Sequence, residues 1–218
     1  MDLVVLASGH GSNLRAIAAA IDAGECAARI AGVVSDRSSA EALDFAAARG
    51  VPTAVVPLRK GDDRQQWNIA LADALADFEP DLIVFAGFMR VVGPPILARF
   101  PGIILNVHPA LLPSFPGVDG AQQAIDARVR ISGCTVHVVD EGVDTGPILA
   151  QAAVPVLPDD DRDSLHHRIQ VQEHRLLPRV IHWVGTGALE LRPRPRFTVP
   201  VSGSDARLVF PRLADEAP

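Results

Sequence analysis

The sequence predicts an α/β protein with a doubly wound, mostly parallel central sheet and an antiparallel addition in its C-terminal half. Over about the first 107 residues, short runs rich in Val, Ile and Leu alternate with Ala-rich helical stretches. Strands that are apolar on both faces and separated by helices are typical of a parallel sheet covered on both sides. After position 108, two strand-like runs follow each other with only a loop between them, so they can pair as a hairpin.

The first half supplies five strands and four helices. The expected strands are 3–6, 29–34, 53–56, 82–85 and 103–107. The expected helices are about 14–23, 40–49, 65–78 and 95–99. Each helix stands between two strands, as the crossover connections of a parallel sheet require.

The second half begins with a stiff loop, 109–117, which holds three prolines and a glycine. A helix near 122–127 leads to the strand runs 134–139 and 148–156. A long helix over about 164–184 closes the fold, although Pro178 lies within it.

We expect one domain rather than two, because no repeat, linker or change of composition interrupts the chain. Its range is 1–190, with one half over about 1–100 and the other over about 101–190. The tail, 191–218, begins with an Arg-Pro-rich run that suits an edge strand or an extended surface segment, so we expect it packed or extended.

The composition excludes several chemistries. Two cysteines, Cys26 and Cys134, are too few for a disulfide framework or a thiolate zinc cluster. Tyrosine is absent, which removes phenolic acids and bases. Lys60 is the only lysine and lies in a polar turn, so neither a Walker A loop nor a Schiff-base lysine is expected.

The net charge of −6 and the pI near 5.6 argue against sequence-independent binding of nucleic acid. No apolar run is long enough to span a bilayer, and the first strand is too short and its start too uncharged for a signal peptide. We therefore expect a cytoplasmic protein whose partners are small molecules, with no nucleic acid and no membrane.

The first candidate site is the loop 8–13, which reads Ser-Gly-His-Gly-Ser-Asn between a strand and a helix. Glycines allow a close backbone approach, and the first amides of a helix attract anions. Ser12 or Asn13 can cap the helix and still bind a phosphate. A dinucleotide site would need a third glycine where Leu14 stands, and an ordinary tight turn remains the alternative. We favour a monophosphate site.

The second candidate is Asn106-Val-His108-Pro at the end of the fifth strand. Residues two apart on a strand point to the same face, and doubly wound sheets bind ligands at their carboxyl ends. The Asn106 amide can stabilise an oxyanion, and His108 can exchange protons near neutral pH. A polar pair that merely completes a strand-to-loop junction is the alternative.

The third candidate is the acidic loop 140–147, which carries three carboxylates in five residues. Its spacing does not match a calcium-binding loop, so we expect no metal. One of these carboxylates can reach His108 and raise its pKa, but the residues alone do not select which. Among the other histidines, His137 either lies in the core or reaches the site. The histidines between 166 and 182 fit the polar face of the long helix.

Several motifs in the same order resemble the phosphoribosylglycinamide formyltransferase family, which belongs to the folate-dependent formyltransferases. The motifs are the Gly-His-Gly-Ser-Asn loop, the Ala-Gly-Phe-Met-Arg stretch from 86, the Asn-Val-His-Pro stretch from 106, Gly-Cys-Thr-Val-His from 133 and Asp-Thr-Gly-Pro from 144. The likeness covers about residues 2–190 and implies a single Rossmann-like formyltransferase domain, with the phosphate-binding half first and the folate and catalytic half second. The early Gly-Ser-Asn loop is what points to the enzymes that act on glycinamide ribonucleotide.

The resemblance also implies a role for individual residues. Asn106 and His108 would be the catalytic pair, and Asp144 would set the protonation of His108. The ribonucleotide and its phosphate would be held by Gly11, Ser12, Asn13, Gln170 and Glu173. The folate site would comprise Arg64, Met89, Arg90, Val91, Val92 and Asn106, with the loop Asp140, Glu141, Gly142, Val143 and Asp144. The sequence departs from the family at Asp119, where relatives generally carry a histidine.

The implied reaction transfers the formyl group of 10-formyltetrahydrofolate directly to the amine of N1-(5-phospho-D-ribosyl)glycinamide. The products are formylglycinamide ribonucleotide and tetrahydrofolate, in de novo purine biosynthesis, with no metal required. We expect a monomer or homodimer.

Alternatives are a methionyl-tRNA formyltransferase, a formyltetrahydrofolate hydrolase and an inactive folate- or phosphate-binding homologue. The first two families carry an additional domain for which we expect no room, since about 28 residues follow Glu190 and the chain begins at its first strand.

Overall fold

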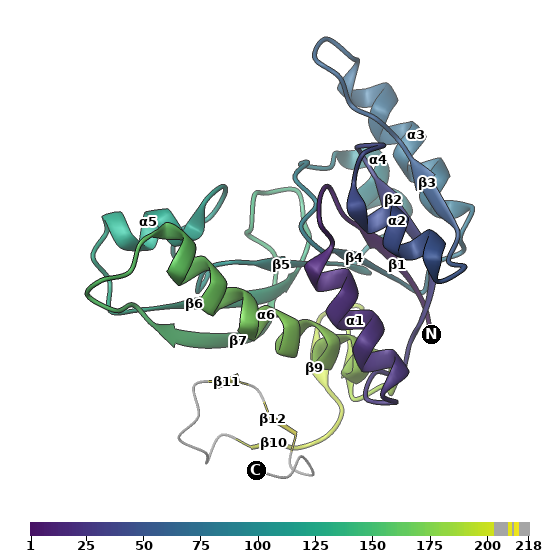
Figure 1. Ribbon diagram of the computed structural model, residues 1–218. Helices are drawn as coiled ribbons and strands as arrows, with labels where there is room; N and C mark the ends of the chain where they lie inside the picture. Colours follow the sequence, from purple (N-terminus) through teal and green to yellow (C-terminus); the bar gives the residue numbers. More distant parts are fainter. Residues whose placement is uncertain (203–208, 211, 214–218) are drawn as a thin grey trace.

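The computed structural model describes residues 1–202, 209–210 and 212–213. Within this part, the fold is built on an eight-stranded sheet in the order β11-β7-β6-β5-β4-β1-β2-β3 (Figure 1). The strands of this sheet are β1 (Asp2–Leu6), β2 (Arg29–Ser35), β3 (Thr53–Val55), β4 (Leu82–Phe85), β5 (Ile104–His108), β6 (Ile131–Val138), β7 (Ile148–Pro155) and β11 (Val209–Phe210).

The pairing directions confirm the predicted fold class. Strands β3, β2, β1, β4 and β5 are parallel neighbours, whereas β5–β6, β6–β7 and β7–β11 are antiparallel. The predicted hairpin therefore forms, and its first strand also pairs with β5. This register places Asn106 opposite His137 and His108 opposite Thr135.

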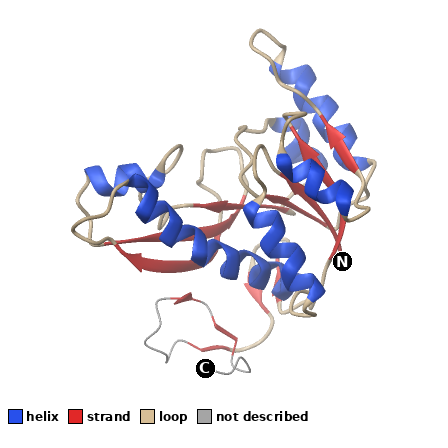
Figure 2. Ribbon diagram, in the orientation of Figure 1, coloured by secondary structure: helices blue, strands red, loops and turns tan. Residues whose placement is uncertain are grey.

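Helices cover both faces of the sheet (Figures 1 and 2). They are α1 (Ser12–Asp22), α2 (Glu41–Ala48), α3 (Arg64–Ala76), α4 (Pro94–Arg99), α5 (Gly120–Asp126) and α6 (Arg162–Gly185). Alternate residues of β1 enter different cores: Leu3 and Val5 belong to the core that includes residues of α1, α2, α5 and α6, whereas Val4 and Leu6 belong to the core that includes residues of α3 and α4. All four side chains are fully buried, and each such burial stabilises the fold by about 1.5–3 kcal/mol.

The long helix α6 confirms the prediction that one helix continues through Pro178. A capping box at its start joins the Asp161 side chain to the Ser164 amide and the Ser164 side chain to the Asp161 amide. Leu176, Leu177, Val180 and Ile181 surround the proline and are buried, so packing against the sheet offsets the backbone hydrogen bond that proline cannot donate.

The Arg-Pro run of the tail connects two short strands, β8 (Leu189–Glu190) and β9 (Arg196–Phe197), which form a small antiparallel sheet of their own. The Phe197 ring packs edge-on against Trp183 of α6, with 5.4 Å between ring centroids. Farther along, β10 (Val201–Ser202) pairs with β12 (Arg212–Leu213). The rest of the predicted tail, 203–208, 211 and 214–218, lies outside the described residues.

No helix in the described part of the chain has both the length and the apolar character needed to cross a membrane.

The strand order determines where a ligand can bind. The chain moves outward from β1 to β2 and β3 on one side, then returns to β4 and β5 on the other. At such a reversal the loops that follow adjacent strands diverge and leave a crevice at the carboxyl ends. The ends of β1, β4 and β5 meet there, because Leu6 pairs with Phe85 and Phe85 with Asn106.

Candidate active site

The loop after β1 ends at Gly11, which is the N-cap of α1 and has a left-handed backbone with φ of 71°. A Cβ at this position would lie 2.8 Å from the Cβ of Ala42, so both the conformation and the close packing favour glycine. The first amides of α1 have no partner within the helix and open toward the end of the sheet.

Our expectation that Ser12 or Asn13 caps this helix is wrong. Gly11 occupies the cap position and no side chain caps the helix, because both polar side chains turn toward α6 instead. The Ser12 hydroxyl accepts a hydrogen bond from Gln170 Nε2 at 3.0 Å, and Asn13 Nδ2 donates to Glu173 Oε2 at 3.0 Å.

The structure thus brings all five residues of the expected ribonucleotide site together. Glu173 is 5% exposed, and its burial raises the pKa of its carboxyl although the hydrogen bond from Asn13 opposes this. Asn13 Oδ1 is buried and has no hydrogen-bond partner in the described part of the chain. The residues alone predict a long closing helix here and no ligand site, although the three-residue spacing of Gln170 and Glu173 puts them on one helix face.

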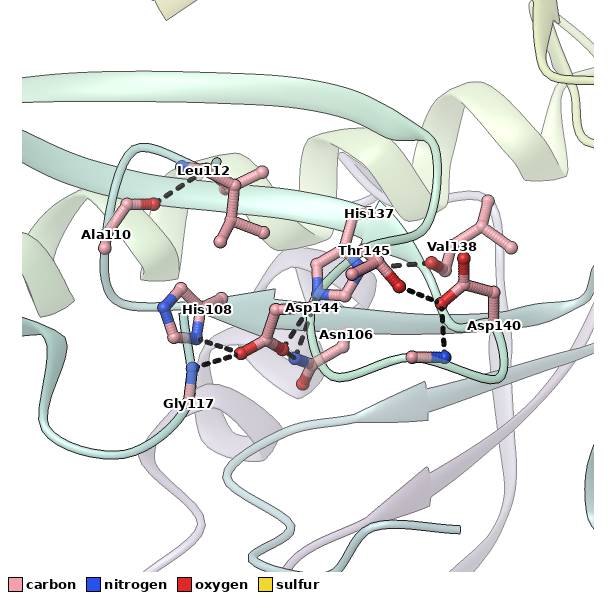
Figure 3. A network of polar contacts seen from close by, with 12 residues as sticks. Asn106, His108, Ala110, Leu112, Gly117, His137, Val138, Asp140, Asp144 and Thr145 are labelled. Atoms are coloured by element: carbon pink, nitrogen blue, oxygen red, sulfur yellow. Dashed lines mark hydrogen bonds and ion pairs between the residues drawn. The ribbon is translucent and has the colours of Figure 1, made fainter. Parts of the chain in front are cut away.

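Asn106 and His108 end β5 and project toward the acidic loop, as the spacing predicts (Figure 3). His108 is 3% exposed, and both of its ring nitrogens are engaged. Nε2 lies 2.8 Å from the carbonyl oxygen of Phe115, which only accepts, so Nε2 carries a proton. Nδ1 lies 3.3 Å from Asp144 Oδ2, which identifies Asp144 as the carboxylate that reaches the histidine.

The Asp144 carboxylate raises the pKa of His108, as expected, but the net shift is downward. Burial lowers the pKa of the imidazole below its usual value, because the charged form loses its hydration. The hydrogen bond to Phe115 and the Asp144 carboxylate raise it, His137 lowers it further, and burial has the largest effect. The sequence pattern predicts that a carboxylate lies near His108, but it does not predict how deeply the His108 side chain is buried.

Asp144 is held in a fixed orientation beside the histidine (Figure 3). Its backbone is left-handed, with φ of 56°, and its Oδ2 accepts a hydrogen bond from the Gly117 amide at 2.8 Å. Burial raises the pKa of this carboxyl, but interactions with His137, Gly117 and His108 lower it more, and the net direction is downward. Asp144 therefore stays ionised at neutral pH.

His137, which the sequence left between a core and a site role, faces the site from β6 and is 2% exposed. Its Nδ1 lies 3.0 Å from the Val138 carbonyl oxygen and therefore donates, and its Nε2 lies 3.5 Å from Asp144 Oδ1. Asn106 Nδ2 lies 3.1 Å from this Nε2 and 3.4 Å from Asp144 Oδ1. His137 thereby fixes which way the Asn106 amide points.

The loop 109–119 forms one wall of this centre and contains two further non-glycine residues with a left-handed backbone, Phe115 (φ 58°) and Asp119 (φ 60°). A bulky residue in this region carries backbone strain, which surrounding contacts must offset. The conformation aims the Phe115 carbonyl at His108. Asp119 pairs with Arg162 at the start of α6, with Nε 3.0 Å from Oδ1.

The expected folate segment follows β4 and is attached on both flanks. Arg64 Nη2 donates to the Val91 carbonyl at 2.5 Å, while the guanidinium of Arg90 turns inward to Asp36. Met89 and Val91 are 68% and 56% exposed, whereas Val92 is buried. The segment therefore offers two apolar side chains and its main chain to the crevice.

The loop 140–144 is shaped by Asp140, whose Oδ1 accepts hydrogen bonds from the Gly142 amide and the Thr145 hydroxyl. Glu141, Gly142 and Val143 are exposed beyond it. Across the described ranges, no group of three His, Cys, Asp or Glu side chains is arranged to hold a metal ion.

Comparisons with known proteins show which family the chain resembles. Residues 1–181 match the model of the family described as formyl transferase. The chain is 50% identical over 186 residues to a phosphoribosylglycinamide formyltransferase of Mycobacterium tuberculosis, covering 84% of this chain and 85% of that protein. It is 36% identical over 191 residues to the enzyme of the same name from Escherichia coli, covering 88% and 90%.

Solved structures are similar as well. The glycinamide ribonucleotide transformylase 1 of Symbiobacterium toebii superposes with a TM-score of 0.86 at 42% identity, covering 90% of this chain and 93% of that one.

Proposed function

The chain belongs to the formyl transferase family, and we propose that it carries out the reaction named by its relatives: formyl transfer to phosphoribosylglycinamide in purine biosynthesis. The formyl donor is a folate, and we propose 10-formyltetrahydrofolate. The protein acts as a single formyltransferase domain over residues 1–190, in the cytoplasm, as a monomer or homodimer.

One observation supports this proposal: the proposed ribonucleotide-binding and catalytic residues lie at the carboxyl ends of nearby strands of one sheet. The ribonucleotide end combines the first amides of α1 with Ser12 and Asn13, which contact Gln170 and Glu173. The catalytic end combines Asn106, His108 and Asp144 at the end of β5, two strands away from β1 in the sheet. A phosphate bound at the helix start would leave the substrate's amine free to extend toward β5.

In the proposed reaction the unprotonated amine attacks the formyl carbon, and negative charge develops on the formyl oxygen. His108 Nε2–H, which in this structure donates to the Phe115 carbonyl, donates to that oxygen instead. The Asn106 N–H that now makes the long, 3.4 Å contact with Asp144 is the second donor. Donors fixed in advance act strongly in a buried site, since little reorganisation is needed during the reaction.

Asp144 supports the developing charge from the other side of the imidazole. The ionised carboxylate beside Nδ1 favours a proton on that nitrogen, and the ring that carries both protons stabilises the negative formyl oxygen by its positive charge. The carbon–N10 bond then breaks, and the proton lost by the amine passes to N10. Placing two substrates side by side accounts for much of the expected acceleration.

The folate is proposed to lie between the 89–92 segment and the 140–144 loop. Met89, Val91 and Val143 offer exposed apolar surface for a flat ring, and main-chain groups offer hydrogen bonds. Arg64, at the start of α3, holds the Val91 carbonyl and so contributes to the shape of this site.

A two-substrate assay tests the proposal. Purified protein is incubated with 10-formyltetrahydrofolate and glycinamide ribonucleotide, and tetrahydrofolate formation is followed with each substrate omitted in turn. We expect turnover only when both are present. Product release without the ribonucleotide would indicate a hydrolase, and no turnover with both would refute the proposed function.

A further inference from the structure

Asp36 is a buried carboxylate for which the proposed reaction has no use. It follows β2, and its side chain is completely shielded from solvent. Oδ1 accepts a hydrogen bond from the Ser8 hydroxyl at 2.6 Å, and Oδ2 accepts one from Arg90 Nε at 2.6 Å. Both contacts are short, as expected where the acceptor is ionised.

The carboxylate determines the direction of the hydrogen bonds around Ser8. Because an ionised carboxylate only accepts, the Ser8 hydroxyl must donate to it and turn a lone pair outward. That lone pair accepts from the Met89 amide at 3.0 Å, and the Ser8 amide donates to the Gly87 carbonyl at 3.1 Å. Ser8 therefore ties the end of β1 to the segment that follows β4.

The carboxylate also determines where the Arg90 side chain goes. Besides its bond to Asp36, the guanidinium donates from Nη2 to the Leu58 carbonyl at 3.3 Å, so it is turned into the protein. On the opposite flank, Asn68 Oδ1 accepts from the Gly93 amide at 2.6 Å. Asn68 has no part in the catalytic centre, and here it holds the far end of the same segment.

We propose that Asp36 is a positioning residue for the formyl donor: through Ser8 and Arg90 it fixes the 89–92 segment in the shape that receives the folate. This inference rests on the proposed function, since it assumes that the segment binds folate. Its two anchors act on neighbouring residues, the amide of Met89 and the side chain of Arg90. Losing them would leave that end of the segment without its side-chain attachments to Asp36 and Ser8.

Asparagine cannot take over this role. An asparagine side chain at this position has one oxygen for two donors, and its amide group would face either Arg90 or Ser8 with a hydrogen instead of a lone pair. We therefore expect Asp36→Asn to raise KM for 10-formyltetrahydrofolate about tenfold, with KM for the ribonucleotide changing less than about twofold. A tenfold change corresponds to about 1.4 kcal/mol.

The matched control is Arg37→Ala, which removes an exposed cation 3.9 Å from the same carboxylate. We expect it to keep both KM values. Arg90→Met, which removes only one of the two anchors, should raise KM for the folate in the same direction but by less. This variant also covers the case in which Asp36→Asn does not fold.

Hydrogen exchange of the peptide over 86–93 supplies a readout that needs no substrate. In the ligand-free protein, Asp36→Asn and Arg90→Met should each speed exchange there relative to Arg37→Ala. If the variants lower only thermal stability, or raise both KM values alike, Asp36 is structural and the inference is overturned. If the wild-type protein shows no two-substrate turnover, the proposed function itself fails, which is a different result.

Discussion

The two ends of the proposed site are built in different ways. At the ribonucleotide end, regular elements present the polar groups: the start of α1 and one face of α6, joined by Ser12–Gln170 and Asn13–Glu173. At the catalytic end, irregular loops hold the groups, and both Phe115 and Asp144 have left-handed backbones. Binding a phosphate therefore uses the free amides that a helix start offers, whereas aiming a proton donor requires strained backbone that many contacts hold in place.

The comparison predicts that substitutions at the catalytic end reduce kcat most. His108→Ala should lower kcat by about 10²–10⁴, the range for loss of a proton donor. KM for the ribonucleotide should change little, because the helix start and α6 remain. Steady-state kinetics measure this, with Lys60→Ala as an exposed control and circular dichroism to show that the fold is kept. A wild-type kcat in His108→Ala would remove the distinction between the two ends.

Asp144→Asn should have the next largest effect. It removes the charge beside Nδ1 but leaves the Nε2 donor, so we expect kcat to fall by about 10- to 100-fold, as for one hydrogen bond to a charged group. Since the carboxylate raises the pKa of His108 against burial, its loss should lower that pKa further. A proton NMR titration of the His108 ring measures the pKa, with Asp159→Asn as the exposed control. A pKa that does not move would show that Asp144 and His108 are not coupled.

The contrast between regular elements and irregular loops also explains which features the sequence predicts. The alternation of apolar runs and helices predicts the parallel sheet, because each strand's burial on two faces is visible residue by residue. The sequence also predicts that Asn106 and His108 point to the same side, because residues two apart on a strand share a face. The direction of the His108 pKa shift does not, because burial by the loop 109–119 depends on contacts that are distant in sequence.

Three further features also required the structure. The role of His137 depends on the antiparallel register that places it opposite Asn106. The contact of Glu173 with Asn13 joins residues 160 positions apart, which no local pattern reveals. Asp36 follows a strand end, where the sequence does not show which groups an acidic side chain contacts. The structure shows that it accepts hydrogen bonds from Ser8 and Arg90.

At the ribonucleotide end, a single substitution should change binding more than chemistry. Ser12→Ala removes the hydroxyl that accepts from Gln170 and that is proposed to contact the phosphate. We expect KM for the ribonucleotide to rise by about 2- to 12-fold, the equivalent of about 0.5–1.5 kcal/mol for one hydrogen bond. The kcat should stay within about twofold. If kcat falls as far as in Asp144→Asn, the two ends do not divide binding from chemistry.

The smallest expected effect concerns stability, and here the two ends respond to pH in opposite directions. Burial raises the pKa of Glu173, so its carboxyl favours the folded state below its unfolded pKa, and this contribution is lost as pH rises through the folded value. Burial lowers the pKa of His108, so its contribution is present above its usual pKa and is lost as pH falls through the folded value. A lower pH therefore favours folding through Glu173 at the ribonucleotide end and opposes it through His108 at the catalytic end.

Glu173→Gln isolates the first of these contributions, because glutamine keeps the oxygen that accepts from Asn13 and carries no charge at any pH. At pH 8 the variant should melt roughly 2–4 °C above the wild type, the shift that about 1 kcal/mol produces in a protein of this size. The difference should shrink as the pH falls, because the wild-type carboxyl then takes up its proton. Thermal melts from pH 5 to 8 measure it, with Glu25→Gln as the exposed control. A difference that is constant across this range would mean that the buried carboxyl does not titrate, and the opposition between the two ends would then rest on His108 alone.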